Sequence, residues 1–237
     1  MAMFLLIHGG WHGGWCWKKV IPLLRAAGHE VCTPTLTGLG ERAHLLSAEV
    51  TLETHVQDVV GVLEYEDVRD VVLVGHSYGG MVITAVAERA ADRLAHLVYL
   101  DAFVPQDGQA LAELVDPTFY ATLEKRARTE GEGWRVPAPP LARWSITTEA
   151  DVRWMQPRIG AHPLKTFQQP VRLTNPAAAV LPRTFIYCRD KPAGDSFASL
   201  AARLRAEPRW RYRELATGHD AMVTAPQEVA ALLLELA

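Results

Sequence analysis

The most informative stretch of this chain is Val71-Val-Leu-Val-Gly-His-Ser-Tyr-Gly-Gly-Met81. It reads G-x-S-x-G directly after a β-branched apolar run and directly before a helical pattern, which is the context of a nucleophile elbow. In such a turn the serine, here Ser77, takes a strained backbone conformation, and Gly75 and Gly79 let the strand and the helix approach closely enough to hold it. The pattern predicts a Ser77 hydroxyl exposed at the carboxyl end of a strand, with the Tyr78 N–H facing any negative charge that develops beside it.

Length, charge and cysteine usage narrow the class of protein. The chain has 237 residues and a net charge of −3, which suits a single α/β domain and provides no basic field for nucleic acid. No segment is long and apolar enough to span a bilayer, and strand-like Phe4–Ile7 lacks the basic and longer apolar regions of a signal peptide. Cys16, Cys32 and Cys188 form no CxxC pair and are expected to be reduced thiols. We therefore expect a cytoplasmic protein that binds neither nucleic acid nor membrane.

Strand and helix patterns alternate along most of the chain. Such alternation favours a mainly parallel sheet with helices on both faces, and it places function at the carboxyl ends of the strands. Six short apolar runs bounded by turn residues are predicted as strands: Phe4–Ile7, Glu30–Thr33, Val71–Val74, His96–Leu100, Thr184–Cys188 and Arg211–Leu215. The predicted helices are Trp17–Ala27, Leu52–Glu64, Gly79–Ala91, Ser196–Ala206 and Pro226–Leu236.

One long segment interrupts this alternation. Residues 105–182 show no clear strand pattern, but they contain an amphipathic stretch, Leu111–Arg128, and the proline-rich run Pro137–Pro140. So long an insertion between sheet elements is typically functional, and aromatic and proline-rich segments over a strand end form apolar pockets. We therefore predict a core made of residues 1–104 and 183–237, with residues 105–182 as a lid.

Ser77 would need two partner side chains, because a serine hydroxyl is a poor nucleophile unless a base accepts its proton and an acid orients that base. His219 is predicted as the base, since it lies just after the last predicted strand. Asp190 and Asp101 each follow a predicted strand, so both would lie at the same edge of the sheet. Asp190 is favoured because it fits the usual arrangement of such sites, in the chain order Ser, Asp, His. Asp220 is adjacent to His219 and would have difficulty reaching its Nδ1.

A glycine-rich loop, His8-Gly-Gly-Trp-His-Gly-Gly-Trp15, follows the first predicted strand. Side chains would block close backbone approach there, and a loop of this kind supplies the second N–H donor to an oxyanion. The loop contains neither G-x-x-x-x-G-K-[ST] nor G-x-G-x-x-G, so nucleotide binding is not expected. His8 and His12 are four residues apart, but the glycines disfavour a helix, and no zinc site is predicted.

Several stretches match one known family: His8–Trp17, Pro22–His29, Pro34–Arg42, Val74–Met81, Cys188–Lys191 and Gly218–Met222. Through them the chain resembles the α/β-hydrolases grouped around plant methyl-ester esterases of the salicylate-binding type and hydroxynitrile lyases, with their bacterial esterase relatives. The resemblance covers nearly the whole chain and implies an α/β-hydrolase fold, with a mainly parallel, doubly wound six-stranded sheet and a lid insertion. It implies Ser77 as nucleophile, His219 as base and Asp190 as acid. The oxyanion hole is implied to consist of the backbone N–H groups of Gly10 and Tyr78.

Two positions depart from the hydroxynitrile lyases, which resemble the chain but have threonine where Gly9 stands and lysine where Asp220 stands. Those groups handle the cyanohydrin hydroxyl and the departing cyanide, and a carboxylate would repel that anion. The favoured interpretation is a serine hydrolase that cleaves small to medium hydrophobic or aryl carboxylic esters through an acyl-enzyme, with neither metal nor cofactor. Two alternatives stay open: a hydroxynitrile lyase-like C–C lyase, and a ligand-binding protein that kept the fold without turnover.

Aromatic side chains are predicted to line the substrate pocket. An apolar cleft with aromatic faces suits a hydrophobic or aryl ester better than a charged one, and no cluster of Arg or Lys can be assigned to the cleft from sequence. The expected partner is therefore a small hydrophobic ester, and a homodimer is left open. The candidate pocket residues are Trp11, His12, Phe103, Phe119, Trp134, Trp144 and Trp154.

Overall fold

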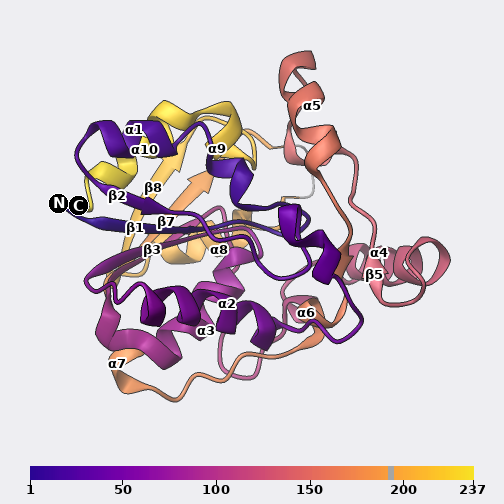
Figure 1. Cartoon of the computed structure of the whole chain (residues 1–237), viewed down its shortest axis with the longest axis horizontal. Coiled ribbons are helices and arrows are strands. Elements are labelled where there is room, and N and C mark those ends of the chain that lie inside the picture. Colours follow the sequence, from indigo (N-terminus) through magenta and orange to yellow (C-terminus); the bar gives the residue numbers. More distant parts are fainter. Residues whose placement is uncertain (192–194) are drawn as a thin grey trace.

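A six-stranded parallel sheet forms the centre of the molecule (Figure 1). The computed structural model describes residues 1–191 and 195–237. The strand order is β2-β1-β3-β4-β7-β8, and every neighbouring pair runs parallel, so the predicted doubly wound sheet is confirmed. The strands are β1 (Met3–Ile7), β2 (Glu30–Cys32), β3 (Val71–His76), β4 (Leu94–Leu100), β7 (Arg183–Cys188) and β8 (Trp210–Leu215).

Helices cover both faces of this sheet, as Figure 1 shows. On one face lie α1 (Ile21–Ala26) and α10 (Pro226–Leu234), and on the other lie α2 (Leu52–Tyr65) and α3 (Gly79–Ala90). All residues of β3 are buried, as expected for a strand with helices on both sides. The other elements of the core are α8 (Ala198–Arg205), α9 (Ala221–Thr224) and the 3-10 helices η1 (Gly14–Trp17), η2 (Gly40–Leu45) and η3 (Ala91–Arg93).

The first predicted helix is shorter than the sequence pattern indicated. The pattern predicted one helix over Trp17–Ala27, but the chain forms η1, breaks, and starts α1 at Ile21. Pro22 lies in the first turn of α1, where its missing N–H has no intrahelical acceptor to lose. A proline in that position marks a helix start, which explains why the helix does not extend back to Trp17.

The order of the strands reverses at β1, which pairs with β2 on one side and with β3 on the other. In open parallel sheets the crevice at the carboxyl ends beside such a reversal is where ligands bind. Ile7, the last residue of β1, is paired in register with Gly75 near the end of β3. The topology therefore brings the glycine-rich loop and Ser77 together.

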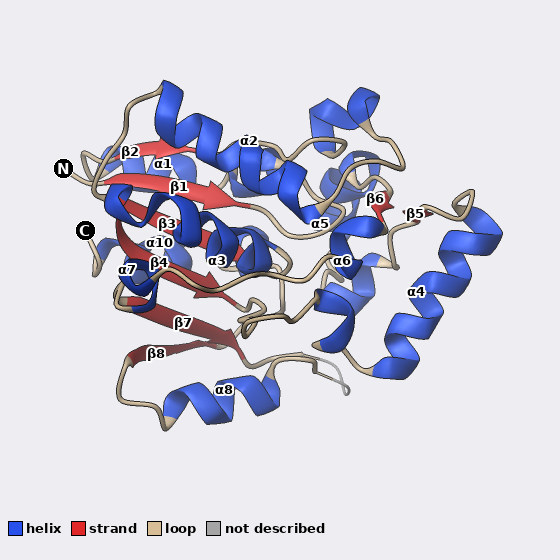
Figure 2. Cartoon of the chain, turned by 90° about the horizontal axis from the view of Figure 1, so that it is seen from below, coloured by secondary structure: helices blue, strands red, loops and turns tan. Residues whose placement is uncertain are grey.

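The segment between β4 and β7 holds the predicted lid residues 105–182. Contrary to the sequence pattern, it contains two strands, β5 and β6, which pair antiparallel. Each has only two residues, too few for a periodicity to reveal. Figure 2 shows α4, α5, β5 and β6 beyond the carboxyl ends of the sheet strands. The elements are η4 (Leu111–Glu113), α4 (Pro117–Glu130), β5 (Arg135–Val136), η5 (Leu141–Trp144), α5 (Glu149–Met155), η6 (Gln156–Arg158), β6 (His162–Pro163), α6 (Lys165–Gln168) and α7 (Pro176–Ala179).

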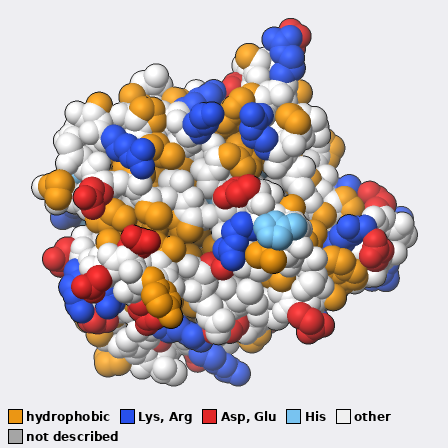
Figure 3. Space-filling model, viewed as in Figure 1, with side chains coloured by type: hydrophobic (Ala, Val, Ile, Leu, Met, Phe, Trp, Pro, Cys, Tyr) orange, Lys and Arg blue, Asp and Glu red, His pale blue; other side chains and the backbone are white. Residues whose placement is uncertain are grey.

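Acidic and basic side chains are interspersed on the face drawn in Figure 3, and neither sign forms a continuous field there. Among the described residues, no helix has the length and apolar character needed to cross a bilayer.

Candidate active site

Ser77 occupies the sharp turn that the sequence predicted. Its φ is 53°, a strained value for a residue with a side chain. The strain is held by the surroundings, since the Ser77 N–H donates to Leu100 O at 3.3 Å and the Ser77 carbonyl accepts from the Phe103 N–H at 3.1 Å. A Cβ on Gly75 would lie 2.6 Å from Gly79 O, so the close approach of strand and helix requires glycine there. These contacts fix the backbone of the turn and therefore the direction in which the Ser77 side chain points.

His219 is held by Asp101, the aspartate that follows β4. The Nδ1 of His219 lies 2.6 Å from Asp101 Oδ2, and both residues are buried. Asp101 has a φ of 43°, and this turn brings its carboxylate back over the end of the sheet. The same carboxylate accepts from the Cys188 N–H at 3.1 Å and from Lys191 Nζ at 2.7 and 2.8 Å. Its charge and its lone pairs are therefore matched by fixed donors.

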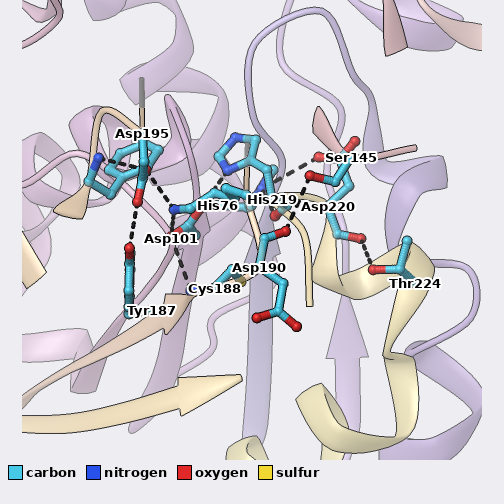
Figure 4. Close-up of polar contacts among 12 residues, drawn as sticks. His76, Asp101, Ser145, Tyr187, Cys188, Asp190, Asp195, His219, Asp220 and Thr224 are labelled. Carbon is cyan, nitrogen blue, oxygen red and sulfur yellow. Dashed lines mark hydrogen bonds and ion pairs between the residues drawn. The ribbon is translucent and has the colours of Figure 1, made fainter. Parts of the chain in front are cut away.

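The prediction that Asp190 holds the histidine is wrong for this structure. The backbone beyond β7 continues to pair with the chain beyond β8, because the Asp190 N–H donates to Thr217 O at 3.0 Å. That pairing directs the Asp190 side chain outward, where it is 57% exposed, and Figure 4 shows its carboxylate pointing away from His219. Asp101 is the alternative aspartate that the sequence left open.

The other ring nitrogen of His219, Nε2, makes no hydrogen bond within the described residues. His219 and Ser77 line the same cavity. An imidazole whose Nδ1 is held by a carboxylate presents Nε2 as the proton acceptor. The arrangement suits removal of a proton from a group in the cavity.

The glycine-rich loop lies against the turn that carries Ser77, because the end of β1 is paired in register with the end of β3. In the described part of the chain, neither the Gly10 N–H nor the Tyr78 N–H donates a hydrogen bond, although both residues are buried. Two buried donors without acceptors are costly unless something in the site accepts from them. A Cβ on Gly9 would lie 2.9 Å from both Ser77 Cβ and His76 Nδ1, so any side chain there would displace one of them. The arrangement leaves two free N–H groups beside Ser77.

Three histidines around this loop are neutral, and their hydrogen bonds show why. His8 Nδ1 faces Gly9 O at 2.8 Å and must donate, whereas its Nε2 accepts from the Leu36 N–H at 3.1 Å. His162 Nδ1 likewise accepts from the Trp11 N–H. In His55, Nε2 faces the Thr37 carbonyl and must donate, so Nδ1 accepts from the Tyr78 hydroxyl. Each ring thus holds one proton, and protonating its second nitrogen would break a bond.

Acid should destabilise the fold steeply because of these rings. Burial lowers the pKa of His8 to about 3 and that of His55 to about 4, and it takes the pKa of His162 well below the usual 6.5. A depressed histidine pKa contributes stability that is present above the unfolded value and is lost as pH falls below it. At a pH of about 5, each of these rings should lower the free energy of unfolding by about 2 kcal/mol relative to neutral pH. This is a sizeable share of the total free energy of unfolding of a typical protein, about 5–15 kcal/mol.

Urea unfolding followed by circular dichroism from about pH 7.5 to about 5 measures this loss. His55→Gln should flatten the dependence by about one proton. A stability that stays constant over this range would contradict the neutral assignment.

An apolar cavity of about 240 Å³ lies over Ser77 and His219. Four of the seven predicted pocket residues line it, namely Trp11, Phe103, Phe119 and Trp144. The remaining lining residues are Tyr78, Leu111, Val115, Leu123, Ala142, Arg143, Phe167, Lys191, Asp195, Ser196 and Phe197. Most of these come from the segment between β4 and β7, so that segment builds the wall of the cavity.

Three predicted pocket residues are corrected. His12 is 1% exposed and bonds to Asp220 behind the cavity. Trp154 packs on Trp15, with ring centroids 5.3 Å apart, and Trp134 lies beside the guanidinium of Arg135. Neither indole lines the cavity. Aromatic composition alone could not separate these residues from those that line the cavity.

Two basic residues of the cavity were missed by the sequence analysis. Lys191 is neutralised by Asp101 and also by Asp195 at 2.9 Å. Arg143 stacks its guanidinium 4.0 Å from the ring centroid of Phe119, and no carboxylate of the described residues forms a salt bridge with it. Lys191 directly follows Asp190 after β7, so its position at the strand end was a signal; nothing in the sequence placed Arg143.

Truncating Phe119 should weaken substrate binding more than the chemistry. Phe119→Ala removes one wall of the cavity, and partial loss of the burial of an aromatic ring corresponds to about a tenfold rise in KM for an aryl ester, the substrate class that the sequence predicts. Trp134→Ala is the matched control, because it removes a larger aromatic side chain of the same segment that does not line the cavity. Steady-state kinetics on p-nitrophenyl esters compares the two variants. An equal effect of both would mean that the cavity is not the binding site.

Within residues 1–191 and 195–237, one group of side chains has possible metal-ligand atoms within 4.8 Å of one another: His76, His219 and Asp220. Their atoms already have other uses, since His219 Nδ1 bonds to Asp101 and Asp220 Oδ2 faces His12. His76 Nε2 faces the His219 carbonyl at 3.0 Å and so carries its proton. All three residues are buried, and the set reads as a hydrogen-bonded cluster rather than an open coordination site.

The fold and this site define an α/β hydrolase, and comparison with known proteins agrees. A family model described as the alpha/beta hydrolase family matches residues 4–232, and the chain belongs to this family. It is 41% identical over 244 residues to a carbendazim hydrolyzing esterase of Nocardioides sp. (strain SG-4G), with 100% of both chains covered. It is 26% identical to salicylic acid-binding protein 2 of Nicotiana tabacum, covering 99% of this chain and 96% of that protein.

Among solved structures, an extracellular α/β-hydrolase from a Paenibacillus species superposes with a TM-score of 0.84 at 26% identity. The match covers 100% of this chain and 99% of the other. That protein is described as sharing structural and functional homology with the tobacco salicylic acid-binding protein 2. Together with the bacterial esterase relative, these matches make the chain an esterase-type α/β hydrolase.

Proposed function

We propose that the protein hydrolyses small to medium hydrophobic or aryl carboxylic esters through a Ser77–His219–Asp101 triad and an acyl-enzyme. The observation that carries this proposal is the His219 Nδ1–Asp101 Oδ2 contact of 2.6 Å in a cavity that also contains the strained Ser77. A buried carboxylate that fixes a histidine is the support that an activated serine needs.

In the proposed mechanism Ser77 Oγ attacks the ester carbonyl while His219 Nε2 takes its proton. Negative charge on the carbonyl oxygen is stabilised by the N–H groups of Gly10 and Tyr78, whose donors are otherwise unused. Protonated His219 then passes its proton to the leaving alcohol, and Asp101 stabilises the imidazolium in between. In the second half-reaction, water replaces the alcohol and attacks the acyl-enzyme carbonyl while His219 takes its proton. The acid is then released, and Ser77 recovers its hydroxyl proton from His219. These steps use only side chains and backbone groups of this chain.

The substrate class follows from the walls of the cavity, which are mainly aromatic and aliphatic. A hydrophobic or aryl ester would bury its apolar surface against Trp11, Phe103 and Phe119. Arg143 adds one cationic edge, suited to a carbonyl or other electron-rich group of a neutral ester. The small-molecule ester is thus the proposed partner, while the homodimer and the cytoplasmic location stay predictions, one relative being described as extracellular.

Hydroxynitrile cleavage is not favoured, although the reason differs in part from the one that the sequence suggested. Asp220 does not face the cavity, so its charge would not meet departing cyanide directly. The space beside Gly9 still excludes a threonine side chain without displacement of Ser77 or His76. The esterase proposal therefore rests on Gly9 and on the triad geometry rather than on charge repulsion by Asp220.

A panel of substrates tests the proposal. It contains p-nitrophenyl esters of increasing acyl length, aryl methyl esters, a charged ester, mandelonitrile, and carbendazim, for which the bacterial relative is named. We expect faster turnover of apolar esters than of the charged ester, and no useful mandelonitrile cleavage. Mandelonitrile cleavage faster than that of every ester would establish the lyase alternative. Binding without turnover of any compound would establish the ligand-binding alternative.

A further inference from the structure

His12 lies at the junction of three loops that form the proposed site. Its Nδ1 is 2.7 Å from Gly10 O in the glycine-rich loop, and its Nε2 is 3.2 Å from Asp220 Oδ2. Its ring centroid is 4.8 Å from that of Trp144, a lid residue that lines the cavity. Neither His12 nor Asp220 lines the cavity, so we expect neither to contact substrate.

The two contacts of His12 fix its protonation. A backbone carbonyl only accepts hydrogen bonds, so Nδ1 must carry a proton to bond with Gly10 O. An ionised carboxylate also only accepts, so Nε2 must carry one to bond with Asp220. With both nitrogens protonated, the ring is an imidazolium. This sets His12 apart from His8, whose two contacts require one donor and one acceptor.

Charges around the pair agree with this assignment. Burial alone would lower the pKa of His12, but the Asp220 carboxylate outweighs it and raises that pKa above its usual value. Burial would likewise raise the pKa of Asp220, yet the charge and hydrogen bond of His12 outweigh it and hold that pKa below its usual value. Burial keeps three neighbouring groups neutral, because it lowers the pKa of His8 and His76 and raises that of Cys16. His219 also lies near Asp220, but its Nδ1 is bonded to Asp101.

The position of the contact matters for the proposed oxyanion hole. The peptide group between Gly10 and Trp11 directly follows the Gly10 N–H along the chain. His12 donates to the carbonyl of this peptide, and neutral His162 accepts from its N–H at 3.2 Å. The peptide plane is thus clamped at both ends, although Trp11 has a φ of 64°. The second ring nitrogen of His12, Nε2, bonds to Asp220, which directly follows His219 in the chain.

We propose that doubly protonated His12 and Asp220 form a buried positioning pair that fixes the Gly10 N–H relative to His219. The inference rests on the proposed esterase function and adds to it two residues that act through others. The pair holds the Gly10 N–H in place before substrate arrives, and loss of its charge lets the glycine-rich loop shift.

Nuclear magnetic resonance of ¹⁵N-histidine-labelled protein tests the protonation directly. We expect one histidine with two slowly exchanging ring N–H protons and two protonated-type nitrogen shifts at neutral pH, still present at about pH 8. His12→Gln should remove these signals and so assign them. Asp220→Asn should convert the same ring to a single N–H. A single ring proton on His12 in the wild type at neutral pH would overturn the proposal, whether or not the variants fold.

Kinetics tests the positioning role. Asp220→Asn and His12→Gln should each lower kcat for p-nitrophenyl acetate about 10- to 100-fold with KM nearly unchanged, because a small displacement of one donor affects the transition state more than binding. The double variant should be little worse than either single variant, because both lose the same contact. Unchanged kcat in folded Asp220→Asn would overturn the role.

His96→Gln is the matched control, because His96 is also buried but bonds to Thr184 near the amino ends of β4 and β7, away from the carboxyl ends where the site lies. It should reduce stability without reducing kcat. A wild-type protein that hydrolyses no ester would refute the proposed function, whereas the nuclear magnetic resonance result would still decide the protonation of His12.

Discussion

Ser77→Ala should abolish ester hydrolysis, with kcat expected to fall by about 10⁴-fold or more, because loss of the nucleophile has such an effect in other serine hydrolases. The substitution removes one hydroxyl from a partly exposed residue and leaves the strained φ of 53° in place. Stability should therefore change little. Turnover of a p-nitrophenyl ester and thermal unfolding, measured on the same preparations, check both expectations.

Ser196→Ala is the matched control, because Ser196 also lines the cavity but follows β7 and lacks the strained turn. This variant should retain most of its activity. A serine-directed phosphonate should add once to the wild type, at Ser77, and mass spectrometry of the labelled peptide identifies the site. Labelling at another serine, or near-normal turnover by Ser77→Ala, would refute the nucleophile.

Asp101→Asn should cost about 10⁴-fold in kcat, by analogy with triad aspartates. The amide can donate to His219 Nδ1 and would then stabilise the wrong tautomer, with the proton on Nε2. Asp190→Asn should change kcat by less than about threefold, because the Asp190 side chain is exposed and makes no contact with His219. Comparison of kcat in these two variants measures the effect. A larger loss of kcat in Asp190→Asn than in Asp101→Asn would mean that Asp190 is the acid of the triad.

Loss of the Asp101 charge also leaves Lys191 without one of its two carboxylates, and breaking such a buried pair costs roughly 3–5 kcal/mol of stability. The double variant Asp101→Asn/Lys191→Met removes the uncompensated ammonium as well. It should recover part of the stability without recovering activity. Recovery of both would mean that the first loss came from unfolding rather than from the missing carboxylate.

Those parts of the site that depend on neighbouring residues in the chain could be predicted from the sequence. The strained turn at Ser77 needs Gly75 and Gly79, and these lie within two residues of it. Strand–helix alternation determined the parallel sheet, and His219 was found because it follows the last strand. Such features are local, because a turn, a strand end and a helix start are each specified within a few residues.

Which residues far apart in the sequence come into contact follows from the three-dimensional packing of the chain. Asp101 and Asp190 both follow strands, but pairing of the chain beyond β7 with that beyond β8 turns Asp190 outward, and the positive φ of Asp101 turns its carboxylate inward. The sequence predicted His12 as a pocket residue. In the structure it bonds to Asp220, 208 residues away in sequence, and does not line the cavity. Side-chain direction at a strand end and the pairing of buried charges depend on long-range backbone packing, which periodicity and spacing do not encode.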